Sequence, residues 1–180
     1  MKKDTYMQEA TKLLRLQKHD TSNILQIALS YLQLNMNQEA ENYMKQAIQE
    51  MHCKGIFLNI VYPKLVISLL SQMDKTFRLA VPLTVECKSS LENTNLDEEL
   101  LTELLDKVWD EIIASQLRSP REERVINFIV DIDDSFVFVG DNLKTHIKAD
   151  TINELNALFS KIGYKLVCSD EVLRISKSDF

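Results

Sequence analysis

The fold of this chain depends most on the stretch Leu13–Leu34, which reads LLRLQKHDTSNILQIALSYLQL and contains neither proline nor glycine. On a helix that turns by about 100° per residue, its apolar side chains cover well over half of the circumference. These residues are Leu13, Leu14, Leu16, Ile24, Leu25, Ile27, Ala28, Tyr31, Leu32 and Leu34. A helix that packs against a single neighbour needs a narrower apolar stripe, so we expect this helix to be covered on more than one side.

The remaining arc of the same helix is polar, and it contains a histidine. Its members are Lys12, Arg15, His19, Ser22, Gln26 and Ser30. The sequence therefore predicts a helix that is apolar almost all round, with His19 in a narrow strip that faces solvent.

Length, composition and charge limit the classes of protein to consider. The chain has 180 residues, of which 45% are apolar and 27% charged, and only 3 glycines and 3 prolines. These values favour a largely helical globular protein of one substantial domain or two small ones. The net charge of −6 argues against nucleic acid or an anionic membrane surface as the main partner, because no broad basic surface is available.

The sequence also indicates where the protein is located. No signal peptide follows Met1, and no stretch approaches the roughly 18 apolar residues of a membrane span. The cysteines Cys53, Cys87 and Cys168 are odd in number and far apart, which fits neither a disulfide framework nor a zinc site. We therefore expect a cytoplasmic protein with reduced thiols, no bound metal and no membrane partner.

A second helix is predicted after a break at 35–37, and it ends near Gly55. Its apolar residues recur at helical spacing: Ala40, Tyr43, Met44, Ala47, Ile48 and Met51. The two helices form an antiparallel hairpin, but the second helix offers only one apolar stripe. Each buried Leu or Ile stabilises a fold by about 1.5–3 kcal/mol. The surplus apolar surface therefore predicts a homodimer in which two hairpins form a four-helix bundle.

The rest of the chain alternates helices and strands. The predicted order is helix 61–77, strand 78–86, helix 96–116, strands 124–132 and 136–139, helix 151–162, and strands 165–168 and 172–175. Thr151 is expected to begin the third of these helices, with Glu154 completing a capping box. This order predicts an α/β sandwich with helices on one face of a mostly antiparallel sheet. The whole chain is thus expected to be α+β, with domains at 1–55 and 56–180.

Several conspicuous residues of the second domain are expected to be structural. Trp109 lies on the apolar side of its helix and is predicted to be in the core. His146 lies in a polar connection and is predicted to be solvated. Asp106, Asp110 and Glu111 are expected on a solvent-exposed helix face.

The chemistry of a phosphoryl acceptor fits His19. An imidazole is largely neutral near pH 7 and keeps a ring-nitrogen lone pair for attack. Phosphoryl transfer further needs an exposed, in-line approach and nearby charge to hold the phosphoryl oxygens. Lys12, Arg15 and Lys18 flank the same strip and can supply that charge.

Other polar residues around His19 complete the candidate site. Asp20 can orient the ring or accept its other N–H, and Asn23, four residues on, is within reach of a hydrogen bond. Ser22 and Gln26 lie on the polar strip, and we assign them with the basic residues to binding the phosphoryl group or its donor.

These residues also carry a family resemblance. The run from Lys18 to Ile27, KHDTSNILQI, followed by Leu32–Leu34 and Glu39–Ala40, resembles the H-box hairpin of citrate-sensing-type sensor histidine kinases. More closely, it resembles the sporulation initiation phosphotransferase B family. The resemblance implies that His19 is the phosphorylated residue, with Asp20 and Asn23 as its fixed neighbours. With the order of elements, it covers nearly the whole chain.

The second domain has an element order similar to the ATP-binding fold of histidine kinases. Residues 100–107 occupy the place of that fold's N-box, but Lys107 stands where a Mg²⁺-binding asparagine is expected. Where an Asp-x-Gly-x-Gly loop is expected, the chain has Gly140-Asp141-Asn142, without a second glycine for close approach to a nucleotide. We therefore interpret this domain as kinase-like but without ATP binding.

The resemblance implies a phosphotransferase of a sporulation phosphorelay. Such a protein accepts a phosphoryl group on His19 from the aspartate of one receiver domain and passes it to a second receiver, a sporulation transcription factor. No cofactor is expected on this chain, and Mg²⁺ comes with the receiver. Two alternatives remain: a sensor histidine kinase fragment that autophosphorylates, or a helical-repeat interaction module, although no second repeat occurs at about 34 residues.

Overall fold

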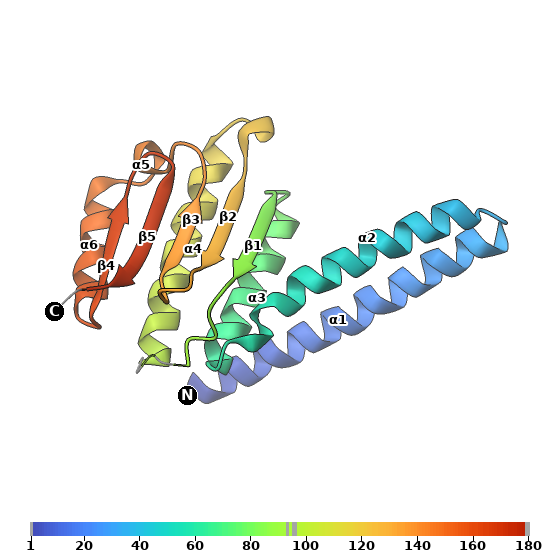
Figure 1. Cartoon of the computed structure of the whole chain (residues 1–180), viewed down its shortest axis with the longest axis horizontal. Helices are drawn as coiled ribbons and strands as arrows, with labels where there is room; N and C mark the ends of the chain where they lie inside the picture. The colour runs from blue at the N-terminus through green and yellow to red at the C-terminus, as the bar shows by residue number, and fades with distance from the viewer. Residues whose placement is uncertain (1, 93, 95–96, 179–180) are drawn as a thin grey trace. The chain divides into compact units, whose positions relative to one another are not determined.

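The computed structural model describes residues 2–92, 94 and 97–178, and the side chains of these residues except 2–5, 49–50 and 52–54. The chain forms two compact units, Met1–Ile56 and Phe57–Phe180. Figure 1 shows two long helices in the first unit and a sheet with helices in the second. The α+β fold class expected from the sequence is confirmed.

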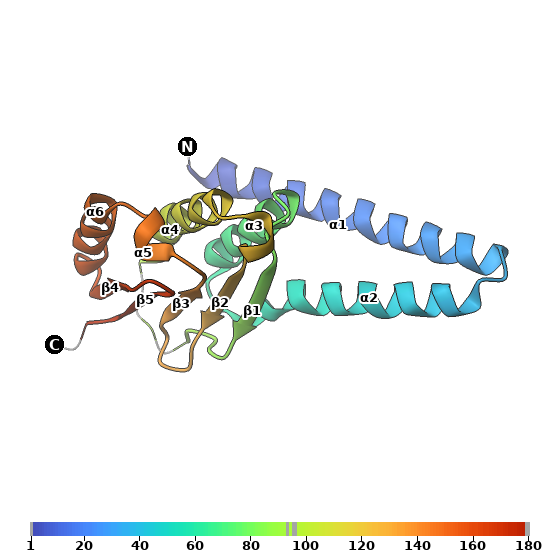
Figure 2. The same cartoon turned by 90° about the horizontal axis from the view of Figure 1, so that it is seen from above.

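The first unit is a hairpin of α1 (Lys2–Gln33) and α2 (Asn37–Gly55). The turn between them places Asn35 in the left-handed region, at φ 57°, and the Met36 amide donates to the Tyr31 carbonyl at 2.9 Å. The helices lie side by side in both views (Figures 1 and 2). Tyr31 and Tyr43 bring their rings to 6.1 Å across the hairpin, close to the turn.

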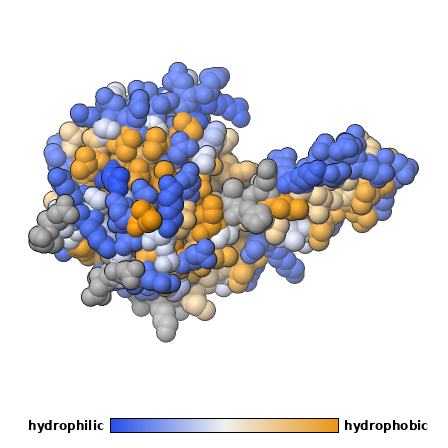
Figure 3. Space-filling model, viewed as in Figure 1, coloured by the Kyte–Doolittle hydropathy of each residue, from blue (hydrophilic) through white to orange (hydrophobic). Residues whose placement is uncertain are grey.

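The hairpin leaves most of its large apolar side chains exposed. The exposed ones are Met7, Leu14, Leu25, Ile27, Leu29, Leu32, Leu34, Met36, Ile48 and Met51. In Figure 3, apolar side chains gather along one side of the hairpin and polar ones along the other. The excess of apolar surface over what α2 alone can cover, predicted from Leu13–Leu34, is thus present in the structure.

The second unit is built around one five-stranded sheet. Its helices and short turns are the 3-10 turn Ile56–Asn59, α3 (Pro63–Arg78), α4 (Glu98–Arg118), the 3-10 turn Arg121–Glu123, α5 (Leu143–His146) and α6 (Ala149–Ser160). Its strands are β1 (Leu83–Cys87), β2 (Ile126–Val130), β3 (Phe136–Val139), β4 (Tyr164–Cys168) and β5 (Val172–Lys177).

The sheet has the order β1-β2-β3-β5-β4, in which only β1 and β2 run parallel. The views agree that α3, α4 and α6 cover one face (Figures 1 and 2). The predicted α/β sandwich with a mostly antiparallel sheet is therefore confirmed.

Aromatic side chains fill the space between that face and the helices. Trp109 of α4 is fully buried, with its ring 5.0 Å from those of Phe128 and Phe138. Phe57 adds a further ring, 5.9 Å from Phe128. Trp109 is thus a core residue, as its position on the helix predicted, and the unit has a core of its own.

One predicted boundary is wrong because the end of a helix displaces it. Strand 78–86 was expected from alternation, but α3 continues to Arg78 and β1 begins only at Leu83. The amides of Leu79 and Ala80 return to carbonyls of α3, and Ala80 has a left-handed φ of 52°. These residues form the end of the helix, which the alternating pattern did not reveal.

The connection at 140–150 also differs from expectation. It contains the short helix α5, and Leu143 and Ile147 are buried. α6 begins at Ala149, so Thr151 lies inside the helix and the predicted cap there is wrong. The predicted start of α4 at Leu96 lies outside the described residues, and Asp97 accepts a hydrogen bond from the Leu100 amide as its N-cap.

Candidate functional site

His19 lies on the outer side of α1, in the middle of an uninterrupted helix. Its side chain is 71% exposed. The helical periodicity fixes which residues lie next to it: Asp20 adjoins it, and Asn23 follows one turn later. The exposure predicted for His19 from the polar strip is therefore present in the structure.

Two neighbours approach the same ring nitrogen. The Asn23 side-chain nitrogen lies 3.3 Å from His19 Nδ1, where it can donate a hydrogen bond whenever Nδ1 carries a lone pair. The Asp20 Oδ1 lies 3.6 Å from the same nitrogen, too far for a hydrogen bond but close enough for electrostatic interaction. Among the residues that the structure describes, none hydrogen-bonds to Nε2. This arrangement leaves Nε2 as the ring atom that an incoming group can reach.

Three cations lie on the turns of α1 that precede His19. Lys12, Arg15 and Lys18 are all exposed. None of them forms an ion pair with a residue in the described part of the chain, so their charges are available to an anionic ligand. Because lysine and arginine bind phosphoryl oxygens, this strip can hold such a group beside the ring.

The remaining predicted site residues, Ser22 and Gln26, are also exposed on α1. The Gln26 backbone carbonyl accepts a hydrogen bond from the Ser30 hydroxyl at 2.8 Å. The structure thus brings Asp20 and Asn23 to the ring, whereas Ser22, Gln26 and the cations line the surrounding surface.

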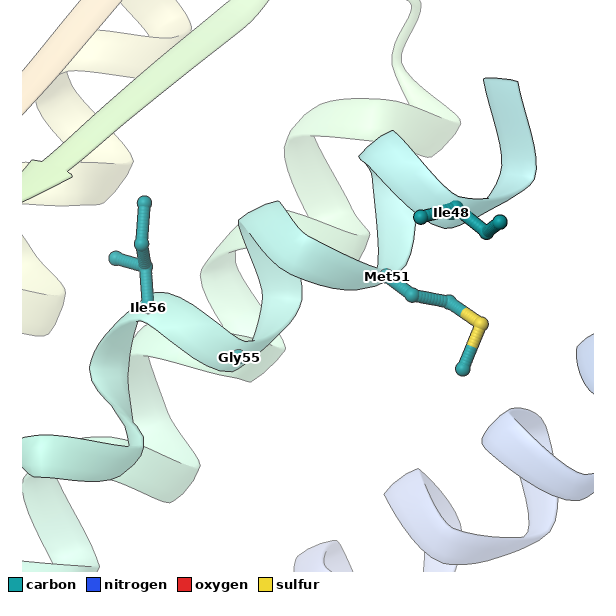
Figure 4. Close-up of a pocket in the computed structure, with 4 residues that line it drawn as sticks. All are labelled: Ile48, Met51, Gly55 and Ile56. Carbon is teal, nitrogen blue, oxygen red and sulfur yellow. The ribbon is translucent and has the colours of Figure 1, made fainter. Parts of the chain in front are cut away.

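A second surface of the hairpin is apolar and follows one stripe of α2. Near the turn, a groove is lined by Leu25, Ala28, Leu29 and Leu32 of α1 and by Asn37, Ala40, Glu41 and Met44 of α2. Towards the other end of α2, a second groove is lined by Ile48, Met51, Gly55 and Ile56. Figure 4 shows Ile48 and Met51 projecting from α2, and a Cβ at Gly55 would meet no atom within 4 Å. The hairpin therefore has open apolar grooves along the length of α2.

In the α/β unit, the predicted remnant of a nucleotide loop packs tightly. The buried Gln116 side chain accepts a hydrogen bond from the Val125 amide at 3.0 Å and donates one to the Asp141 carbonyl at 3.2 Å. A Cβ at Gly140 would lie 2.9 Å from the Val125 carbonyl oxygen. The absence of a side chain at Gly140 thus allows the chain to pack closely against Gln116. The sequence analysis did not predict this role of Gln116. The signal for it is a glutamine at a buried position of a helix.

Two other expectations for this unit are wrong. Asp106 was expected on a solvent-exposed face, but it accepts hydrogen bonds from Ser68 and Gln72 of α3. His146 was expected in solvent, but it is half-buried, and its Nδ1 is buried without a hydrogen-bond partner in the described part of the chain. Asp106 thus joins α4 to α3, and neither residue belongs to the site at His19.

The described residues contain no helix that is long and apolar enough to cross a membrane. No curated protein matches the sequence. A solved structure, "Structure of the cytoplasmic segment of histidine kinase QseC", is similar over 64% of this chain and 73% of that chain, with a TM-score of 0.46 and 10% sequence identity.

The helical hairpin is similar to one known protein family. The family model described as "Sensor_kinase_SpoOB-type, alpha-helical domain" matches residues 1–60. The matched segment contains α1, α2 and the whole of the site at His19. The resemblance stated from the sequence is thereby confirmed for the hairpin, and residues 1–60 of this chain are similar to the SpoOB-type alpha-helical domains of sensor kinases.

Proposed function

We propose that this protein is a histidine phosphotransferase that carries a phosphoryl group between receiver domains of response regulators, with His19 as the carrier. One observation carries the proposal. The His19 ring is exposed, its Nδ1 is approached by Asp20 and Asn23, and its Nε2 is open, on a hairpin of the SpoOB type.

The proposed reaction has two steps. In the first, the Nε2 lone pair attacks the phosphorus of the aspartyl phosphate of a donor receiver. The N–P bond forms, the P–O bond to the aspartate breaks, and the donor carboxylate leaves. The Nδ1 proton passes to the Asp20 carboxylate or to water. In the second step, the aspartate of an acceptor receiver attacks the phosphorus, the N–P bond breaks, and Nδ1 takes a proton back from Asp20 or water as the neutral ring leaves.

The surrounding residues have matching roles. The cations Lys12, Arg15 and Lys18 stabilise the charge on the phosphoryl oxygens, and Ser22 and Gln26 contact the receiver. Mg²⁺ is supplied by the acidic pocket of the receiver. ATP is not used, and the contact of Gln116 with Gly140 and Asp141 supports this part of the proposal. The resemblance to sporulation phosphotransferase B favours a sporulation transcription factor as the acceptor.

The active form is proposed to be a homodimer. The grooves along α2 are lined mainly by apolar side chains, and no residue of the polar strip is among the described residues that line them. A second hairpin supplies apolar side chains of the same kind. Two hairpins related by a twofold axis then form a four-helix bundle with both His19 rings on its outside.

The test is a transfer of label from a phosphorylated receiver to the full chain. Wild-type protein is expected to take up the label and to pass it to a second, unlabelled receiver. His19→Ala should abolish uptake, whereas His146→Ala, at a half-buried histidine of the α/β unit, should retain it. Labelling of His19→Ala, or no labelling of the wild type by any receiver, would contradict the proposal. Labelling of the isolated wild type by ATP would favour the autophosphorylating kinase instead.

A further inference from the structure

The two neighbours of His19 Nδ1 have opposite hydrogen-bonding needs. The Asn23 nitrogen, at 3.3 Å, donates. The ionised Asp20 carboxylate, at 3.6 Å, only accepts. A ring nitrogen that carries a proton needs an acceptor, and one that carries a lone pair needs a donor. Asp20 and Asn23 therefore suit different protonation states of the same ring.

These two states belong to different stages of phosphoryl transfer. Before transfer, Nε2 needs its lone pair, so the proton of the neutral ring is on Nδ1, where Asp20 can accept it. After transfer, Nε2 carries the phosphoryl group, and the neutral phosphohistidine keeps its lone pair on Nδ1. The amide of Asn23 is placed to donate to that lone pair.

We infer that Asn23 is a positioning residue that prolongs the life of the phosphohistidine by donating to Nδ1 of the phosphorylated ring. A proton on Nδ1 makes the ring a better leaving group and speeds hydrolysis of the N–P bond. The Asn23 amide competes with that proton for the lone pair. Asp20 favours the ring that carries a proton on Nδ1, which is the state before transfer. Asp20 therefore assists formation of the phosphohistidine, and Asn23 slows its hydrolysis. The inference rests on the proposed role of His19 as a carrier.

The experiment uses the full chain with the other two of its three histidines replaced, His52→Ala and His146→Ala, so that His19 is the only one. The protein is phosphorylated with phosphoramidate, which needs no receiver. Decay of the phosphohistidine is followed at constant pH by ³¹P NMR, and the ring nitrogens are followed by ¹⁵N NMR. Circular dichroism checks that each variant keeps its helices.

Two substitutions at one position separate the roles of shape and donor. Asn23→Asp keeps the shape and replaces the donor by an acceptor, and Asn23→Ala removes the side chain. Loss of one hydrogen bond predicts a half-life shortened by about threefold to tenfold in Asn23→Asp, with Asn23→Ala in between. In Asn23→Asp the ¹⁵N shift of Nδ1 should move towards that of a protonated nitrogen.

The matched control is Asn42→Asp on α2. Asn42 is exposed and accepts a hydrogen bond from Gln38 at 3.3 Å, which an aspartate can also accept. This variant adds the same charge and should keep the wild-type half-life. Equal half-lives in Asn23→Asp, Asn23→Ala and the parent would overturn the inference, as would a His19 that phosphoramidate cannot label. A parent that phosphoramidate labels but no receiver labels would contradict the proposed function alone.

Discussion

The helical hairpin and the α/β unit place their apolar side chains in opposite ways. The buried apolar residues that the structure describes in α1 and α2 are three alanines, Ala28, Ala40 and Ala47, while the large apolar residues of these helices are mostly exposed. In the α/β unit, large side chains such as Trp109 and Phe128 are fully buried. The α/β unit thus has a core that is complete within one chain. The hairpin has exposed apolar surface of the kind that marks an interaction site.

The polar side chains differ in the same way. In the α/β unit, Asp106 is hydrogen-bonded by two side chains of α3, and Gln116 ties together backbone groups of distant segments. In the hairpin, the cations around His19 form no ion pair with any described residue. The difference supports the proposal that the hairpin carries the surfaces for binding and chemistry, whereas the α/β unit is a self-contained scaffold.

The largest expected effect is loss of stability on opening the core of the α/β unit. Phe128→Ala removes a ring that contacts Trp109, Phe138 and Phe57. It should lower the free energy of unfolding by about 3–5 kcal/mol, because a cavity remains where the ring was. Urea unfolding followed by the fluorescence of Trp109, the only tryptophan, measures this change.

Val167→Ala is the matched control, because Val167 is 51% exposed on the same sheet. It should change the free energy of unfolding far less. Equal losses in the two variants would mean that this unit does not depend on its aromatic core. If Phe128→Ala lost self-association at temperatures where it stays folded, the hairpin would depend on the core of the α/β unit. That result would contradict the independence of the two units.

The next effect concerns the apolar surface of the hairpin. Leu29→Glu places a charge in the groove near the turn. Burial of an unpaired charge costs several kcal/mol, so the dissociation constant of the proposed dimer should rise by at least about a hundredfold. Sedimentation equilibrium at micromolar concentration measures it.

Gln33→Glu is the control for this change, since Gln33 is exposed on α1 outside the residues that line the groove. It adds the same charge and should leave the mass of the assembly unchanged. A wild-type protein that sediments as a monomer would refute the homodimer, and the exposed apolar side chains would then need another partner.

The same contrast explains how much could be predicted from the sequence. The position of His19 and the excess of apolar surface follow from residue spacing along one long helix, which needs no knowledge of distant segments. The contact of Asp106 with Ser68 joins residues 38 positions apart, and spacing along one helix cannot reveal it. Gln116 and His146 were missed for the same reason, because their surroundings come from other segments. The start of β1 was missed because the cap of α3 uses residues whose pattern alternates like that of a strand.

The smallest expected effect tests the polar contacts of the α/β unit. Asp133 lies in the turn between β2 and β3, where the Ser135 hydroxyl donates to it at 2.6 Å and Arg174 pairs with it at 2.6 Å. The hydrogen bond from Ser135, followed by the contact with Arg174, lowers the pKa of Asp133 below its ordinary value. A carboxyl whose pKa is lowered by folding stabilises the protein above its unfolded pKa, and this contribution is lost as the pH falls through the folded pKa.

An asparagine side chain cannot ionise, so Asp133→Asn should weaken the dependence of stability on pH in the acid range, with little change in the fold. The effect should be small because Asp133 is half exposed and solvent screens its charge. Urea midpoints measured from neutral to acid pH should converge for wild type and variant at the acid end. Phosphorylation of His19 by phosphoramidate at neutral pH should be the same in both. A change in that labelling would show that the turn of the α/β unit influences the hairpin, and the two units would then not be independent.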